Sequence, residues 1–235
     1  MKESYIIAGS RPWCVNAVKH LKNKNIDFFY IKNKEDLNLK SIVSINPRYI
    51  FFPHWSWVIP ATIWNQYECI VFHMTDLPFG RGGSPLQNLI ARGFTETKIS
   101  ALRCEAELDA GPIYIKRPLS LLGTAEEIFI RANNCIADMI NEIIITHPNP
   151  MPQLGEPTYF KRRLPQDSNV SEVTSLEALF DRIRMLDAEG YPQAFIDIND
   201  FRLEFSRASL KTDKIFADVR ITRRDKQNDQ SQSQK

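Results

Sequence analysis

The sequence lacks the features that mark several large classes of protein. It has four cysteines, and no two of them form a Cys-x-x-Cys pair. We therefore expect buried thiols in a reducing cytosol, not a disulfide framework or a zinc site. No apolar run approaches the roughly 18 residues that cross a bilayer, and the first residues lack the layout of a signal peptide. These absences predict a cytoplasmic protein without a membrane partner.

The sequence also has no large excess of charge of either sign. The formal net charge is +2, from 30 basic and 28 acidic residues. So even a balance gives no support to binding of nucleic acid, and we expect no nucleic-acid partner. The chain has 235 residues, of which 43% are hydrophobic. That is enough for one main domain with a buried core and a small appendage.

Standard phosphate and metal motifs are missing as well. The stretch "GRGGS" (80–84) lacks the spacing and the lysine of a P-loop, and "GSRPW" (9–13) lacks the dinucleotide-binding glycine pattern. The four histidines have no paired metal-ligand spacing, so no metal is expected. Two interpretations of the glycines stay open. They form either a plain tight turn or, with Arg81 and the start of the next helix, an anion site.

The pattern that is present alternates short apolar strands with helical segments. Such alternation predicts an α/β fold, with a Rossmann-like, mostly parallel sheet, helices on both faces, and a small α+β C-terminal appendage. We expect strands at 5–9, 26–31, 49–53, 69–74, 97–108 and 112–119, and helices at 13–23, 37–45, 60–67, 84–93, 124–146 and 174–190. The domains that we expect are a catalytic domain (1–150), a proline-rich linker (151–173), a helix with a β-meander (174–221) and a disordered tail (222–235).

One histidine stands where α/β proteins bind ligands. His73 lies near the end of a predicted strand, and ligands bind beyond the carboxyl ends of such strands. A buried carboxylate beside it would tune the imidazole for proton transfer. Asp109, in an Asp-Ala-Gly turn after a later strand, is the partner that we favour. A purely structural histidine remains the alternative. For His54, a role in the core and a role in a pocket wall stay open.

Three separated motifs resemble the folate-dependent formyltransferases over about residues 1–170. They are "HMTDLPFGRGGSP", "DAGPIYIKRPLSLLGTAEEI" and "PTYFKRR". The resemblance implies that His73 takes the place of the catalytic histidine and Asp109 that of its aspartate. The family's asparagine, which helps to stabilise the oxyanion, falls at Val71, which cannot donate a hydrogen bond. Protonated His73, a backbone N–H and His54 on a neighbouring strand end are the candidates to replace it, and His54 is the first to test.

The resemblance also implies a donor and an acceptor. The donor is N10-formyltetrahydrofolate, and the residues expected to bind it are Trp55, Trp57, Val58, Leu108, Ala110 and Gly111. Because the segment after residue 163 is short and not strongly basic, we expect the acceptor to be a nucleotide-linked amino-deoxy sugar, a UDP- or dTDP-linked 4-amino-4,6-dideoxyhexose such as a precursor of pseudaminic acid, for surface-glycan synthesis. Its expected contacts are Ser10, Arg11, Thr75, Arg81, Gly82 and Gly83.

Other acceptors stay open. They are a carrier-bound aminoacyl group, glycinamide ribonucleotide and methionyl-tRNA. A catalytically silent relative that binds only folate or a nucleotide sugar is a further alternative. The sequence leaves open whether the chain forms a homodimer.

Overall fold

The structure is a computed structural model that describes residues 3–9 and 26–224. The chain forms two compact units. Of the described residues, the first unit takes those up to 85, 95–121 and 128–161, and the second takes 86–94, 122–127 and 162–224. The helix predicted at 13–23 lies outside the described residues.

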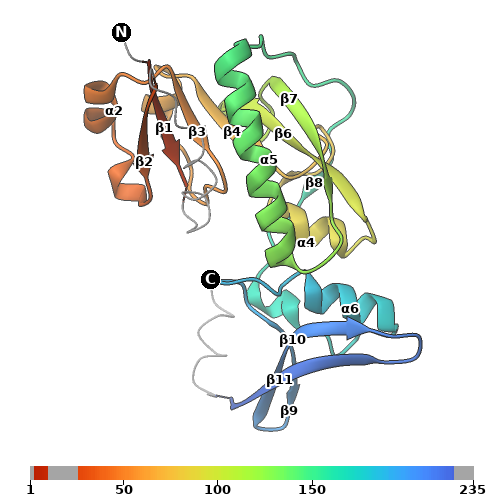
Figure 1. Cartoon of the computed structure of the whole chain (residues 1–235). Helices are drawn as coiled ribbons and strands as arrows, with labels where there is room; N and C mark the ends of the chain where they lie inside the picture. Colours follow the sequence, from red (N-terminus) through yellow and green to blue (C-terminus); the bar gives the residue numbers. More distant parts are fainter. Residues whose placement is uncertain (1–2, 10–25, 225–235) are drawn as a thin grey trace. The chain divides into compact units, whose positions relative to one another are not determined.

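A six-stranded sheet organises the first unit (Figure 1). Its strands, in the order β2-β1-β3-β4-β6-β7, are Ile26–Ile31, Glu3–Ala8, Tyr49–Phe52, Cys69–His73, Glu96–Arg103 and Ile113–Ser120. The first four strands are mutually parallel, and β6 and β7 are antiparallel to their neighbours. The predicted α/β fold with a mainly parallel sheet is confirmed.

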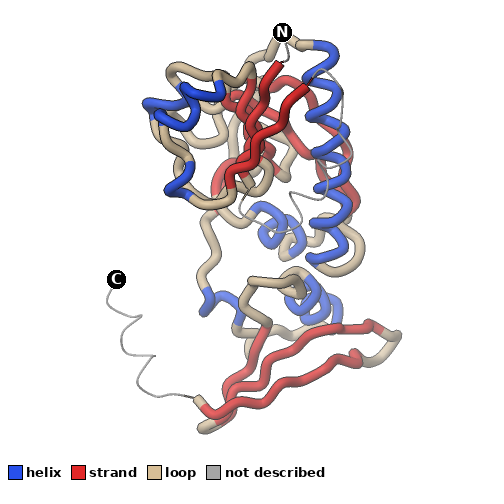
Figure 2. Tube along the Cα trace, turned by 60° about the vertical axis from the view of Figure 1, so that its left-hand side comes forward, coloured by secondary structure: helices blue, strands red, loops and turns tan. Residues whose placement is uncertain are grey.

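Both faces of this sheet are covered, which explains why its parallel strands are nearly continuous apolar runs. On one face, Ile42 of α2 (Leu39–Ile45) and Ile63 of α3 (Ala61–Trp64) belong to a buried cluster with strand residues. Alternate strand residues such as Phe51 point to the other face and are also buried. Figure 2 shows the long helix α5 (Ala125–Thr146) on the side of the strands opposite to α2.

Two local features differ from the sequence-based expectation. The strand predicted to run to residue 108 ends at Arg103, because the chain folds back there: a Cβ atom on Gly111 would lie 1.9 Å from the Arg103 carbonyl oxygen. Residues 104–112 therefore form a loop. In addition, a two-stranded parallel ladder joins β5 (Arg81–Gly82) to β8 (Tyr159–Phe160). A pair of two-residue strands has too little sequence pattern to be predicted.

The second unit contains a three-stranded antiparallel sheet, β11-β10-β9, and the helix α6 (Leu176–Arg184). The strands β9, β10 and β11 span Ala194–Ile198, Phe201–Leu210 and Ile215–Arg223. The turn between β9 and β10 is Asn199-Asp200, with Asn199 in the left-handed conformation at φ 53°. The short helix α4 (Pro85–Ile90) lies almost wholly in this unit. No described helix is long and apolar enough to cross a membrane.

Candidate functional site

The site is built around His73, the last residue of β4. Its side chain points to the same face of the sheet as Cys69 and Val71, and it is only 8% exposed. Its Nε2 atom lies 2.8 Å from the carbonyl oxygen of Gly80. Its Nδ1 atom lies 3.5 Å from Oδ2 of Asp109. The structure thus brings together the two side chains that the sequence paired.

Asp109 reaches His73 from the loop between β6 and β7. The same Oδ2 atom accepts a hydrogen bond of 2.9 Å from the backbone N–H of Gly82. Asp109 also has a positive φ of 54°, a left-handed conformation that costs a non-glycine residue roughly 1–2 kcal/mol. Such a conformation persists only where the surroundings hold it in place. The carboxylate is therefore fixed between a backbone donor and the imidazole.

The two contacts of His73 fix the orientation of its ring. The Gly80 carbonyl can only accept, so Nε2 donates to it when it carries a hydrogen. On the other side, the Asp109 carboxylate places negative charge 3.5 Å from Nδ1. The ring is therefore held between a carbonyl oxygen and a carboxylate.

The loop that follows His73 is anchored to β6 and β7. Ser100 on β6 donates to the carbonyl oxygen of Thr75 at 2.8 Å. Lys116 on β7 and Lys98 on β6 contact the two carboxylate oxygens of Asp76 at 2.5 and 2.9 Å. Burial alone raises the pKa of Asp76, but the hydrogen bonds from the two lysines outweigh it and hold this pKa below its usual range. The loop is thus held by charge-assisted bonds on one side of the site.

Arg81 has a different environment from the one predicted. We expected it to face an acceptor diphosphate, but it is 9% exposed and its guanidinium bonds within the chain. It contacts Glu107 at 2.9 Å and donates twice to the side-chain oxygen of Gln153, at 3.3 and 3.0 Å. Gln153 in turn donates to the carbonyl oxygens of Asp109 and Gly111, at 2.8 and 2.9 Å. Arg81 therefore belongs to the frame of the site.

The other predicted acceptor contacts that the structure describes also bond within the chain, and their roles stay predictions. Thr75 is fully buried, and its hydroxyl lies 3.4 Å from the Gly80 carbonyl oxygen. The N–H of Gly82 donates to Asp109 and that of Gly83 to the carbonyl of Phe160, at 2.9 and 3.1 Å. The anion that this loop holds is thus the chain's own carboxylate. Ser10 and Arg11 lie outside the described residues.

The residues predicted to bind the donor lie on two loops. Trp55 and Trp57 contact each other edge to face with ring centroids 4.8 Å apart. The exposed members are Trp57, Val58 and Leu108, at 39%, 87% and 69%, while Ala110 is half-buried and Gly111 is buried. The indole N–H of Trp55 is buried and has no acceptor among the described residues. His54 lies two residues beyond β3, with its ring edge-on to Phe129 of α5 at 5.6 Å. Its role stays a prediction.

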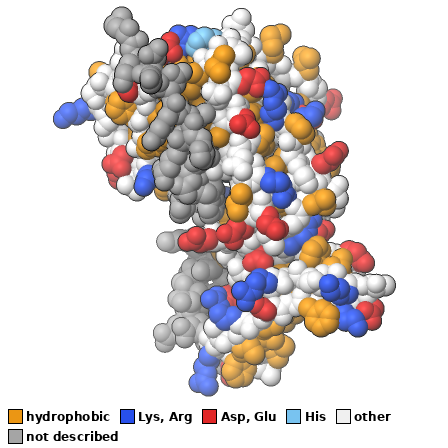
Figure 3. Space-filling model, viewed as in Figure 1, with side chains coloured by type: hydrophobic (Ala, Val, Ile, Leu, Met, Phe, Trp, Pro, Cys, Tyr) orange, Lys and Arg blue, Asp and Glu red, His pale blue; other side chains and the backbone are white. Residues whose placement is uncertain are grey.

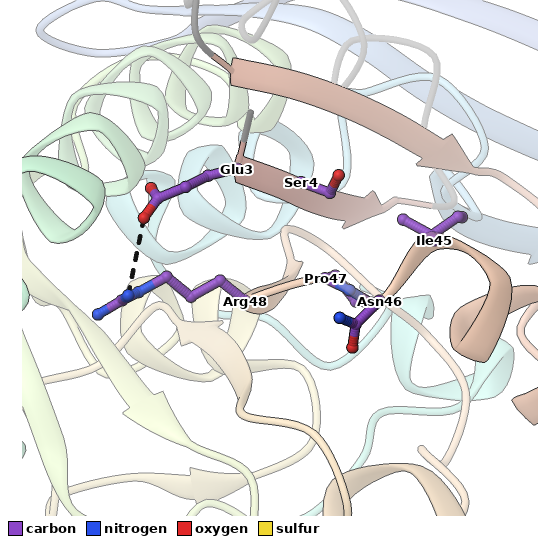
Figure 4. Close-up of a pocket in the computed structure, with 6 residues that line it drawn as sticks. All are labelled: Glu3, Ser4, Ile45, Asn46, Pro47 and Arg48. Carbon is purple, nitrogen blue, oxygen red and sulfur yellow. Dashed lines mark ion pairs between the residues drawn. The ribbon is translucent and has the colours of Figure 1, made fainter. Parts of the chain in front are cut away.

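A cavity lies elsewhere in the first unit (Figure 4). Its volume is about 380 Å³, and its lining comes from Glu3, Ser4, Ile45, Asn46, Pro47 and Arg48. Glu3 and Arg48 form an ion pair of 3.7 Å across it. These residues precede or begin β1 and β3, whereas His73 is the last residue of β4. The cavity therefore lies at the amino ends of the parallel strands, and His73 lies at their carboxyl ends. It contains none of the predicted site residues. The described residues include no group of three or more His, Cys, Asp or Glu side chains that could hold a metal.

Comparison with known proteins identifies the fold as that of formyltransferases. The family model described as "Methionyl-tRNA formyltransferase, C-terminal domain" matches residues 165–222. A solved methionyl-tRNA formyltransferase from Clostridium thermocellum is 51% identical, covers 94% of this chain and 99% of its own, and has a TM-score of 0.92. The chain belongs to the methionyl-tRNA formyltransferase family.

More distant relatives agree with this assignment. The methionyl-tRNA formyltransferase of Thermodesulfovibrio yellowstonii is 24% identical over 187 residues, which are 76% of this chain and 60% of the relative. The chain thus spans about three fifths of the length of that curated relative. HypX from Aquifex aeolicus, solved in complex with tetrahydrofolic acid, is 16% identical with a TM-score of 0.73; it covers 87% of this chain and 37% of its own, and shows the fold alone.

The family assignment confirms one prediction and corrects two others. The predicted membership of the formyltransferases is confirmed. A nucleotide sugar as acceptor is wrong, and so is the expected absence of a nucleic-acid partner, because the relatives at 51% and 24% identity are named for methionyl-tRNA. The error arose from two weak signals, the short C-terminal segment and the balanced net charge. Neither reports the chemistry of an acceptor.

Proposed function

We propose that this chain transfers the formyl group of N10-formyltetrahydrofolate to the amino group of methionyl-tRNA. Membership of the methionyl-tRNA formyltransferase family supports the reaction and the acceptor. The single observation in the structure that carries the proposal is the buried His73, which lies 3.5 Å from a carboxylate that a backbone N–H also holds. Such a pair at the carboxyl end of a strand suits proton transfer and stabilisation of negative charge.

The residues around the pair fit the donor. The loops 54–59 and 107–111 offer exposed apolar side chains for a flat ring, and the buried indole N–H of Trp55 has no acceptor among the described residues. An N–H without an acceptor in a protein interior is costly, and a polar group of a bound molecule would satisfy it. When bound, the donor supplies a formyl carbonyl as the electrophile.

His73 and Asp109 have different roles in this reaction. As an imidazolium, His73 is a cationic hydrogen-bond donor toward negative charge on an oxygen, the part that an asparagine at position 71 would share. To accept a proton from the incoming amine instead, the ring must be neutral, with the lone pair of one nitrogen free. Asp109 keeps the ring oriented and balances its charge in either case. Because Val71 cannot donate a hydrogen bond, His73 must provide more of the stabilisation of that negative charge.

The test is formyl transfer measured with methionyl-tRNA and N10-formyltetrahydrofolate. We expect wild type to be active, and His73→Ala and Asp109→Asn to lower kcat/KM at least about 10²-fold. Asp213→Asn, a change at an exposed carboxylate paired with Lys214, is the control and should keep the wild-type rate. Full activity of His73→Ala would refute the assigned role. A wild-type chain that binds the donor but transfers nothing would be a silent relative.

A further inference from the structure

Gln153 has an unusual set of contacts for a residue in an irregular connection. It lies between α5 and β8, two residues after Met151, whose backbone exchanges two hydrogen bonds of 2.8 and 2.9 Å with Ile113 at the start of β7. This bridge holds the backbone close to Gln153 beside the start of β7. The backbone there is thus already ordered, and the hydrogen bonds of Gln153 need to offset mainly the rotamer freedom of its own side chain.

Every polar group of the Gln153 side chain is used. Its two amide hydrogens go to the carbonyl oxygens of Asp109 and Gly111, at 2.8 and 2.9 Å, and so clamp the turn on both sides of Ala110. Its oxygen accepts two hydrogen bonds from the guanidinium of Arg81, at 3.3 and 3.0 Å. One side chain thus ties the Asp109 turn to the loop that contains Arg81.

Those two segments are the ones that hold His73. The loop contributes the Gly80 carbonyl at 2.8 Å from Nε2, and the Gly82 N–H at 2.9 Å from the Asp109 carboxylate. The turn contributes the carboxylate itself, on a backbone with a positive φ that needs external support. Without Gln153 the two segments would still be joined by the Arg81–Glu107 pair and the Gly82–Asp109 bond. The backbone of the turn would, however, lose the two hydrogen bonds that hold its carbonyl groups, so Asp109 could shift relative to the ring.

We infer that Gln153 is a positioning residue, which holds Asp109 against His73 by tying the turn at Asp109–Gly111 to Arg81. This inference rests on the proposed function for its kinetic consequence. Gln153 touches no reacting atom and acts through Asp109. Because misplacement of a catalytic group by about 1 Å can cost 10²-fold in rate, a displaced carboxylate should lower kcat while the affinity for the acceptor is kept.

Two substitutions separate the bonds of Gln153. Gln153→Met keeps the approximate volume and removes all four hydrogen bonds. Gln153→Glu keeps acceptors for Arg81 but replaces the donors to the turn with carboxylate oxygen, which repels the two carbonyls. We expect both variants to lower kcat about 10- to 100-fold with an unchanged KM for methionyl-tRNA. Gln66→Met is the matched control, because among the described residues the Gln66 amide bonds only to the backbone carbonyl of Thr62 in α3.

A second measurement does not depend on turnover. The ring nitrogens of His73, assigned in the ¹⁵N NMR spectrum through His73→Ala, should shift at fixed pH in both Gln153 variants and stay in place in Gln66→Met. Far-UV circular dichroism establishes that each variant is folded. Folded Gln153→Met with wild-type kcat and unshifted ring resonances would overturn the inference. Wild type without transfer to methionyl-tRNA would refute the proposed function, while the NMR comparison would still decide the role of Gln153.

Discussion

At the scale of single residues, the charged side chains around the site form ion pairs or hydrogen bonds with other groups of the same chain. Asp76 has two lysines, Asp109 has a backbone N–H and the imidazole, and Arg81 has Glu107 and Gln153. Buried or half-buried charges are tolerable when they are paired and hydrogen-bonded in this way. The motif that looked like an anion-binding loop therefore serves the internal order of the site.

Asp76 gives a prediction for pH dependence. Its pKa is lower in the folded chain than the usual value near 3.9. Its contribution to stability is therefore present above about pH 4 and is lost as the pH falls through the lower folded value. Asp76→Asn should lower the free energy of unfolding at pH 7 by at most about 1 kcal/mol, since this side chain is 42% exposed. The difference from wild type should shrink in urea titrations at pH 3. Asp213→Asn should show no such trend, and a difference independent of pH would contradict the assignment.

The sequence predicts contacts between two functional side chains better than contacts between a side chain and the backbone. The pair of His73 and Asp109 follows from motifs in which side-chain identity matters. Gln153 was assigned to a linker, because two of its hydrogen bonds go to carbonyl oxygens that any residue would offer. Its partners are also 44 and 72 residues away in the sequence. The only available signal was the nearby "PTYFKRR" motif, which placed this stretch inside the family resemblance.

At the scale of elements, α5 begins as the sequence predicts. Thr124 and Glu127 form a capping box: the backbone N–H of Thr124 donates to the Glu127 carboxylate at 2.8 Å, and the N–H of Glu127 donates to the Thr124 hydroxyl at 3.3 Å. The bonds satisfy N–H groups that a helix start leaves without intrahelical partners.

The cap should make a measurable contribution to stability. We expect Thr124→Ala to lower the free energy of unfolding by about 1 kcal/mol, measured by urea titration. Thr146→Ala is the matched control at the other end of α5, where the hydroxyl bonds only to the Glu142 carbonyl of its own helix. Equal effects of the two substitutions would show that the capping box has no special role.

Periodicity predicted the long elements and failed on the short ones. The 22 residues of α5 carry a strong apolar face, and they match the predicted helix within one residue. The helix predicted at 174–190 ends at Arg184, and the strand predicted to reach 108 ends at Arg103. Tertiary contacts decide these ends: in the second case the close approach of Gly111 to the Arg103 carbonyl forces the chain out of the sheet.

At the scale of the whole molecule, charge is spread without a dominant sign. Lysine and arginine side chains alternate with aspartate and glutamate over the face in Figure 3. The net charge of +2 had suggested the absence of a nucleic-acid partner, yet the chain belongs to a family named for a tRNA substrate. Net charge describes long-range attraction, and it does not exclude local recognition of an acceptor.

The division into two units predicts separable stability. Arg184, 6% exposed, pairs with Asp181 at 2.6 Å and donates to the Gly123 carbonyl at 2.9 Å, both within the second unit. Arg184→Met leaves a partly buried carboxylate without its cation, so it should cost on the order of 3 kcal/mol. Hydrogen exchange should become faster in α6 and β9–β11, and remain slow in β1–β7.

Lys214→Met is the control for that experiment. Its side chain is 55% exposed and pairs with Asp213, which is 71% exposed, so its loss should change stability by less than about 1 kcal/mol. Faster exchange throughout both units of Arg184→Met would mean that they unfold as one cooperative body.

The small ladder between β5 and β8 sets a lower limit on the length of a working catalytic fragment. A chain cut after residue 150 would still contain His73 and Asp109, but it would have lost the segment that returns to lie against Arg81 and Gly82. Protein engineers who seek a minimal enzyme should therefore keep the sequence through at least Phe160.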